Sequence, residues 1–277
     1  MTIPKRILGR TGQEVTILGL GGEGVLRTVG QDKEAYGLIN GALDLGITYC
    51  ESARAYSGSE SYYGKALKER RKEIFLTSKS HARDRQGALA HLNETLTNMR
   101  TDHLDLWQVH DVREEEEIAE IFGPGGAIEA FTEAKQQGKT RFIGVTGHHD
   151  PSIIRKCIER FDFDTVLMPV NPGEPQYQSF LSGVLPLARE KDMGIIGMKV
   201  YFRGFASKLP EYTTMEPYLR FALSQPVTTV VIGCDDLAQL EQNAAFARAF
   251  EPITTEEQQR LIGDTAPFAR KLMYYKP

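Results

Sequence analysis

Four polar residues with acid–base side chains follow short apolar runs in the first half of the chain. Glu51 ends one run and Tyr56 lies in the loop after it, whereas Lys79 and His110 end the next two runs. A phenol with an ordinary pKa of about 10 is a poor acid near neutrality, and we expect the Lys79 ammonium to lower that pKa. Glu51 would keep the ammonium charged, and His110 would orient a substrate oxygen. Such a set can protonate a carbonyl but contains no reductant, so the hydride must come from a cofactor.

Each of these residues also has an ordinary structural role. A tyrosine in a loop is usually packed, a lysine that ends a strand usually reaches water, and a histidine there often only supports its neighbours. Their occurrence at successive run ends favours catalysis, because catalytic groups of a parallel barrel lie at the C-terminal ends of its strands.

Short apolar runs alternate with amphipathic stretches along most of the chain, and most run ends are spaced by about thirty residues, the size of a βα unit. The expected strand cores are 47–50, 74–77, 104–109, 141–145, 165–170, 194–200 and 228–232. Residues 36–45 and 128–137 have helical periodicity, and Gly138 would close the second helix. Residues 7–17 are typical of a β-hairpin.

This order predicts an α/β fold, a (β/α)8 TIM barrel with an N-terminal β-hairpin and an extra C-terminal helix, since eight units suit a barrel of about 250 residues. An open, doubly wound sheet is the alternative, because residues 19–24 approach its glycine-rich phosphate turn. However, no acidic ribose-binding residue ends a clean second strand. No linker rich in Pro, Ser or Gly divides the chain, so we expect a single domain over residues 1–277.

Composition excludes several classes of protein. The net charge of −4 argues against a nucleic-acid surface, and the acidic run 114–117 is expected to begin a helix. Cys50, Cys157 and Cys234 form no C-x-x-C pair, which argues against iron–sulfur, zinc and disulfide frameworks. No apolar run has membrane-spanning length, and the first residues do not form a signal peptide. We therefore expect a cytoplasmic protein that binds no membrane.

Three segments resemble motifs of the aldo-keto reductase family. Residues 46–60 resemble the signature G-I-x-F-x-D-T-A-x-x-Y-G-x-S-E, residues 74–79 resemble its lysine strand, and residues 102–110 resemble D-x-x-D-L-x-x-x-H. The resemblance runs from about residue 7 to residue 250. It implies a (β/α)8 barrel that binds NADH or NADPH across its mouth and reduces a small-molecule carbonyl substrate.

The resemblance also assigns catalytic roles. It implies Tyr56 as the general acid, Lys79 as the group that adjusts its pKa and His110 as the group that orients the substrate. Glu51 departs from the pattern, because the family has Asp at this position. The charge is kept on a side chain that is one methylene longer, which puts the position of Lys79 and the catalytic rate in doubt.

The nicotinamide ring is held by the second half of the chain in this family. Residues 141–148 resemble the strand R-x-I-G-V-S-N, whose last two side chains hold the carboxamide. Thr146 keeps the hydroxyl, whereas Gly147 replaces Asn, so we expect His148 to substitute for the lost amide. Asn171 matches a further polar position near the ring, although Leu167 stands where Gln is common.

Further positions match the ring face and the pyrophosphate. Met198 occupies the place of the aromatic residue that stacks on the nicotinamide, and its thioether offers a softer face. Lys199 would reach a phosphate or the substrate, and Gly204 lies where the backbone passes close to the pyrophosphate.

The adenosine end resembles I-P-G-x-R-x-x-x-x-x-E-x-N over residues 231–243, where Gly233 and Asn243 match. Asp235 stands at a position that is normally basic, and Gln239 is neutral where Arg is frequent. A carboxylate repels a 2′-phosphate but accepts a hydrogen bond from a ribose hydroxyl. We therefore predict a preference for NADH over NADPH, unless Asp235 only caps the following helix.

Two other functions remain open. A metal-dependent barrel hydrolase could use Glu51, His110, His148 and His149, but the early H-x-H pair of such enzymes is absent, so we expect no metal. A non-catalytic nicotinamide-binding barrel subunit is the second, because Glu51 and Gly147 depart from the family pattern. For the substrate we expect an apolar pocket, suggested by Trp107, Tyr201, Phe202 and Phe205, in a monomer or small homo-oligomer.

Overall fold

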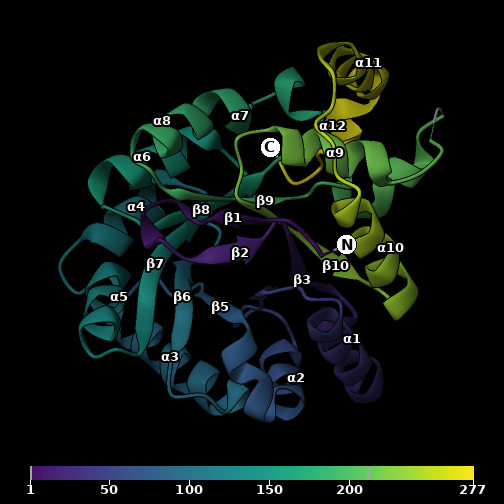
Figure 1. Ribbon diagram of the computed structural model, residues 1–277. Helices are drawn as coiled ribbons and strands as arrows, with labels where there is room; N and C mark the ends of the chain where they lie inside the picture. The colour runs from purple at the N-terminus through teal and green to yellow at the C-terminus, as the bar shows by residue number, and fades with distance from the viewer. Residues whose placement is uncertain (1, 211) are drawn as a thin grey trace.

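Eight parallel strands close into a barrel at the centre of the computed structural model, which describes residues 2–210 and 212–277 (Figure 1). In order around the barrel they are β10 (Thr229–Cys234), β3 (Leu18–Gly24), β4 (Tyr49–Glu51), β5 (Phe75–Ser80), β6 (Leu104–Val109), β7 (Thr140–Thr146), β8 (Thr165–Pro169) and β9 (Gly194–Met198). The parallel pairing of β10 with β3 closes the ring. The barrel prediction is confirmed and the open sheet is excluded; the glycine-rich residues 19–24 lie within β3.

The predicted hairpin is also confirmed. Strands β1 (Lys5–Ile7) and β2 (Glu14–Thr16) pair antiparallel, with η1 (Gly9–Thr11) in the turn. Leu8 and Val15 are fully buried and pack in one cluster with Tyr49, Phe75 and Leu106 from the barrel strands. The hairpin therefore plugs one end of the barrel with apolar side chains, and the other end is left for chemistry.

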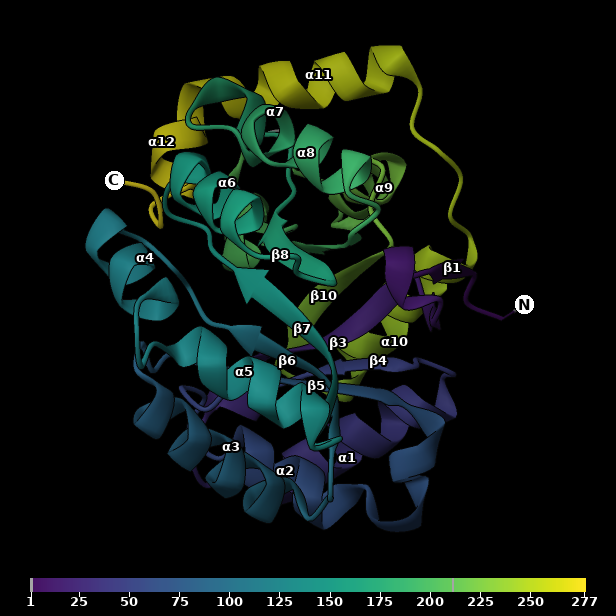
Figure 2. The same ribbon diagram turned by 90° about the vertical axis from the view of Figure 1, so that its left-hand side faces the viewer.

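Helices surround the barrel on all sides (Figures 1 and 2). They are α1 (Asp32–Asp44), α2 (Ser59–Ala66), α3 (Arg85–Met99), α4 (Glu115–Phe122), α5 (Ala127–Gln136), α6 (Pro151–Arg160), α7 (Phe180–Gly183), α8 (Leu185–Glu190), α9 (Glu216–Ser224) and α10 (Leu237–Arg248). Short 3-10 turns lie between them: η2 (Val25–Arg27), η3 (Lys68–Glu73), η4 (Glu174–Gln176) and η5 (Phe202–Lys208). No helix in the described residues is long and apolar enough to cross a membrane.

Two of these helices show why the sequence folds as predicted. In α5 the buried residues Ala127, Ala130, Phe131 and Ala134 recur at the spacing of one helix face, and Gly138 follows with a left-handed φ of 71°. The acidic run 114–117 begins α4, where the Glu114 and Glu117 side chains form a capping box.

The extra C-terminal helix is α11 (Thr255–Thr265), which lies outside the ring of helices and contacts α9 (Figure 2). The chain continues through η6 (Ala266–Phe268) and α12 (Ala269–Leu272) into a short tail. One strand differs from its predicted bounds for a clear reason. The predicted strand over 194–200 ends at Met198, because Lys199 has a left-handed φ of 58°.

Candidate functional site

The structure brings the four predicted catalytic residues together at the open end of the barrel. Glu51 ends β4, Lys79 lies in β5, His110 follows β6, and Tyr56 lies in the loop before α2. The buried Lys79 Nζ lies 3.0 Å from Glu51 Oε1 and donates hydrogen bonds to the Ser52 carbonyl at 2.9 Å and to the Tyr56 hydroxyl at 3.5 Å. The rings of Tyr56 and His110 stand perpendicular, with centroids 5.9 Å apart.

The ring of Tyr56 contacts Lys79 and also Gly22 and Arg27, which the sequence did not single out. A Cβ atom on Gly22 would lie 2.6 Å from two ring carbons, so glycine in β3 makes room for the phenol. Arg27, from η2, places its guanidinium carbon 5.1 Å from the ring centroid, and Lys79 Nζ lies 4.7 Å from it. The sequence does not predict a role for Arg27, because this residue lies in the turn after β3, outside any recognised motif.

Burial governs the protonation of the Tyr56 phenol. It raises the pKa of Tyr56 well above its ordinary value, the carboxylates Glu51 and Glu23 raise the pKa further, and Arg27 opposes them. The net shift of this pKa is upward, and the lowering of it by Lys79 stays a prediction. Lys79 is paired closely with Glu51 and only distantly with the hydroxyl, and burial lowers its own pKa against the effect of Glu51. Tyr56 thus keeps its proton, as a proton donor must.

His110 is a neutral imidazole in this setting. Burial lowers its pKa well below the ordinary value, and Lys79, followed by His148, lowers it further. Its backbone is fixed on both sides, because its N–H donates to the Ser80 carbonyl at 2.9 Å and its carbonyl accepts from Arg83 at 2.9 Å. The ring can therefore orient a substrate by hydrogen bonding without carrying a charge.

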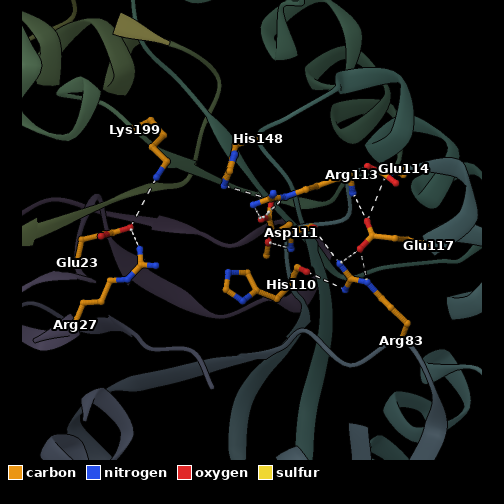
Figure 3. Close-up of polar contacts among 11 residues, drawn as sticks. Glu23, Arg27, Arg83, His110, Asp111, Arg113, Glu114, Glu117, His148 and Lys199 are labelled. Carbon is orange, nitrogen blue, oxygen red and sulfur yellow. Dashed lines mark hydrogen bonds and ion pairs between the residues drawn. The ribbon is translucent and has the colours of Figure 1, made fainter. Parts of the chain in front are cut away.

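Charged residues surround the other side of the same cavity, which has a volume of about 680 Å³ (Figure 3). Asp111 has a left-handed φ of 55°, and its N–H donates to Thr146 Oγ1 at 2.9 Å. Its carboxylate accepts from Arg113 at 2.6 Å and lies 3.3 Å from His148 Nε2. Burial lowers the pKa of His148 to about 4, although Asp111 opposes that shift. The predicted residues Thr146 and His148 thus face the cavity of Tyr56 and His110.

The expectation of an apolar substrate pocket is wrong. Trp107 is fully buried on the outer face of β6 and stacks on Phe131 of α5 with centroids 3.7 Å apart. Phe202 is also fully buried. The cavity is lined mainly by charged and polar side chains, among them Glu23, Arg27, Arg83, Asp111, Arg113, Glu117, His148 and Arg203.

The hydrolase alternative loses support too, because the Glu51 carboxylate needed as a metal ligand is paired with Lys79.

A second cavity of about 550 Å³ follows the ends of β3, β9 and β10. It is lined by seven of the predicted cofactor residues: Met198, Lys199, Gly204, Gly233, Asp235, Gln239 and Asn243. Gly21, Gly22 and Gly24 also line it, and Cβ atoms at Gly24 and Gly233 would lie 2.4 Å and 2.6 Å from atoms of the opposite strand. Bare backbone beside Lys199 and Arg203 suits a pyrophosphate, so the residues present fit a nicotinamide dinucleotide.

The residues after β10 show how α10 begins. Its N-cap is Asp236, whose side chain accepts a hydrogen bond from the Gln239 backbone at 2.8 Å. Asp235 is exposed on the cavity, and its own N–H donates to Gln239 Oε1 at 3.0 Å. The alternative in which Asp235 caps the helix is therefore wrong. Asn243 accepts from the Tyr201 hydroxyl at 2.8 Å, a partner that sequence analysis had assigned to the substrate.

Asn171 is the predicted cofactor residue that the structure leaves outside both cavities. It is fully buried. Its amide nitrogen donates to the Lys199 carbonyl at 3.2 Å and to the Tyr275 hydroxyl at 3.1 Å, and its oxygen accepts from the Gly173 N–H at 3.1 Å. Both amide hydrogens are thus used within the protein.

Comparisons with known proteins agree with this geometry. The model of the Aldo/keto reductase family matches residues 17–217. The uncharacterized oxidoreductase YqkF of Bacillus subtilis is 25% identical over 94% of this chain and 96% of its own. L-galactose dehydrogenase of Arabidopsis thaliana is 24% identical over 92% of each chain.

Solved structures show the same fold. The holo form of aldo-keto reductase AKR11C1 from Bacillus halodurans has a TM-score of 0.80 at 24% identity, covering 95% of this chain and 96% of that one. An aldo-keto reductase from Klebsiella pneumoniae in complex with NADPH has a TM-score of 0.77 at 18% identity, covering 100% and 97%. The chain belongs to the aldo/keto reductase family of NAD(P)H-dependent oxidoreductases.

Proposed function

We propose that the protein reduces an aldehyde or ketone to an alcohol with NADH or NADPH, and that Tyr56 is the proton donor. The observation that carries this proposal is the contact of the buried Glu51–Lys79 pair with the Tyr56 hydroxyl, in a cavity shared with His110. A protonated phenol beside a paired ammonium suits donation of a proton to an oxygen that is gaining negative charge.

Each side chain has one task. His110, as a neutral imidazole, donates a hydrogen bond to the carbonyl oxygen and orients it toward Tyr56. A bound nicotinamide would supply the hydride to the carbonyl carbon. The Tyr56 hydroxyl then transfers its proton to the same oxygen, and the phenolate that remains is stabilised by Lys79 Nζ at 3.5 Å. Glu51 keeps Lys79 charged and in place at 3.0 Å.

The cofactor would lie along the second cavity. Met198 would face the ring, Thr146 and His148 would hold the carboxamide, and Gly204 and Lys199 would contact the pyrophosphate. Gly233 and Asn243 would contact the adenosine. Asp235 and Gln239, both exposed at that end, support a preference for NADH over NADPH.

Turnover separates this proposal from a non-catalytic nicotinamide-binding subunit. Purified protein is mixed with each reduced nicotinamide and a panel of aldehydes and ketones, and both nicotinamide oxidation and the alcohol product are measured. We expect one alcohol for each nicotinamide oxidised. Tight binding of a nicotinamide without alcohol from any carbonyl would favour the non-catalytic function.

A further inference from the structure

Residues 274–277 pack against the segment that follows β8, and the Lys276 side chain is buried there. Lys276 Nζ lies 2.6 Å from Glu174 Oε1 and donates to the carbonyls of Tyr177 at 3.1 Å and Gln178 at 2.9 Å. The side chains of Lys276 and Glu174 are both 0% exposed. All three ammonium hydrogens therefore have acceptors, the condition under which a buried charge is tolerated.

Tyr275 joins the same network. Its hydroxyl lies 3.4 Å from Glu174 Oε1 and accepts the hydrogen bond from Asn171 at 3.1 Å. The second oxygen of Glu174 accepts from the Phe180 N–H at 2.8 Å. Asn171 also holds the Lys199 carbonyl, so one amide connects the tail to the loop that follows β9.

The tail also forms part of the cavity that contains Tyr56 and His110. Tyr274, Tyr275 and Lys276 line that cavity. The Tyr275 ring packs edge-on against His148 with centroids 5.6 Å apart, and Lys199 Nζ lies 5.8 Å from its centroid. Tyr274 accepts a hydrogen bond from Arg203 at 2.8 Å. Three residues that line the cavities, His148, Lys199 and Arg203, are thus packed against the tail.

We propose that residues 274–277 are a latch that positions the ligand-binding wall of the cavity. The Lys276–Glu174 pair fixes the tail, and Asn171 acts as a positioning residue that aligns Tyr275 with His148 and Lys199. Asn171 therefore serves the tail instead of the nicotinamide. The part of this inference that concerns substrate rests on the proposed function, whereas the coupling of the tail to His148 and Lys199 does not.

A purely structural tail would predict a different outcome. Loss of the ion pair would then lower stability and free the C-terminal residues, but the segments that carry His148 and Lys199 would remain as ordered as before. Measurements on those two segments therefore separate the latch from simple packing.

The test compares Lys276→Met with Lys271→Met, a matched change at an exposed lysine in α12. Hydrogen exchange is measured by mass spectrometry in peptides covering residues 146–150, 199–205 and 266–277, and NADH affinity is measured by fluorescence. We expect faster exchange in all three peptides of Lys276→Met. We also expect NADH to bind roughly threefold to thirtyfold more weakly and the KM for an aldehyde to rise by a similar factor, with a smaller change in kcat. Lys271→Met should match the parent.

Faster exchange confined to residues 266–277, with parental NADH affinity, would overturn the latch. If Lys276→Met does not fold, two other variants replace it. The double change Glu174→Gln with Lys276→Met removes both buried charges, and the deletion of residues 274–277 removes the tail. For both we expect the same changes in exchange and affinity. If the parent protein reduced no aldehyde, the proposed function would fail, while the exchange of residues 146–150 and 199–205 would still decide the inference.

Discussion

The strand ends around the proposed proton donor and those predicted to carry the cofactor are built differently. Glu51, Lys79 and His110 come from or directly after three adjacent strands, and strand geometry alone brings them together. On the other side, Lys199 and Arg203 follow β9 with left-handed φ values of 58° and 56°. Both contact the tail, since Lys199 Nζ lies 5.8 Å from the Tyr275 ring centroid and Arg203 donates to the Tyr274 hydroxyl at 2.8 Å. Strand ends are rigid platforms, whereas such loops take their shape from contacts distant in sequence.

The two regions also differ in their charges. Lys79 has one carboxylate of its own, Glu51 at 3.0 Å. Glu23, in contrast, is shared by Arg27 at 2.9 Å, Arg203 at 3.3 Å and Lys199 at 3.8 Å (Figure 3 shows Arg27 and Lys199 on either side of it). Burial would raise the pKa of Glu23, but these cations outweigh it and lower the pKa. The excess of cations favours an anion such as a pyrophosphate on this side.

The largest effect is expected from Tyr56→Phe, which removes the proton donor from the rigid side. General acids are typically worth about 10² to 10⁴ in rate, so kcat with an aldehyde should fall by that factor. The fold and the affinity for NADH should be retained, because within residues 2–210 and 212–277 the hydroxyl makes a single, long hydrogen bond, with Lys79 at 3.5 Å.

Steady-state kinetics and fluorescence titration check this prediction together. A variant that reduced aldehydes at nearly the parental rate would show that Tyr56 is not the acid. The difference between the two regions would then have no catalytic meaning.

The next effect concerns the buried pair. Glu51→Gln leaves the Lys79 ammonium without its counter-charge, and breaking a buried pair costs about 3–5 kcal/mol of stability. We expect a lower free energy of unfolding and a changed pH–rate profile. Glu51→Asp, which restores the family residue, should retain or raise activity. Urea unfolding and steady-state kinetics across pH check this prediction. A pH–rate profile of Glu51→Gln that matched the parental profile would contradict it.

The rigid region was also the predictable one. Glu51, Lys79 and His110 end or follow strands whose register fixes where the side chains point, so their spacing predicted that they meet. Tyr56 lies in a loop, and its place was predicted from the resemblance to the family signature. The pKa of Tyr56 was not predictable, because it depends on burial, on Glu51 and on Glu23, which lies in the neighbouring strand β3 but far from Tyr56 in the sequence. The contacts of Asn171 were not predictable for a similar reason. Its partner Tyr275 lies at the far end of the chain, and no local pattern could reveal that contact.

A smaller effect is expected at the adenosine end. NADPH would meet Asp235 and Gln239 where a guanidinium is frequent, and a lost charge-assisted hydrogen bond forfeits about 1.5–3 kcal/mol, roughly tenfold or more in affinity. NADH should therefore bind more tightly at matched ionic strength, and Gln239→Arg should narrow the difference. Gln239→Ala serves as the control, since it removes the amide without adding charge. Equal or tighter binding of NADPH to the parent would overturn this interpretation of Asp235.

The smallest effect is a dependence of stability on pH that arises at His148, in the cavity wall packed against the tail. Burial lowers its pKa to about 4, whereas an unfolded histidine has a pKa of about 6.5. Between these values the unfolded chain binds a proton that the folded protein excludes, so stability falls as pH drops from about 6.5 to about 4. The loss at about pH 5 should be at most about 2 kcal/mol. His148→Gln should reduce this loss, whereas His103→Gln, on the exposed surface, should keep it. Urea unfolding near pH 5 and near pH 7 measures this loss of stability in both variants. An equal loss in His148→Gln and in the parent would show that the pH dependence arises at another group, and the buried His110 would be the next one to test.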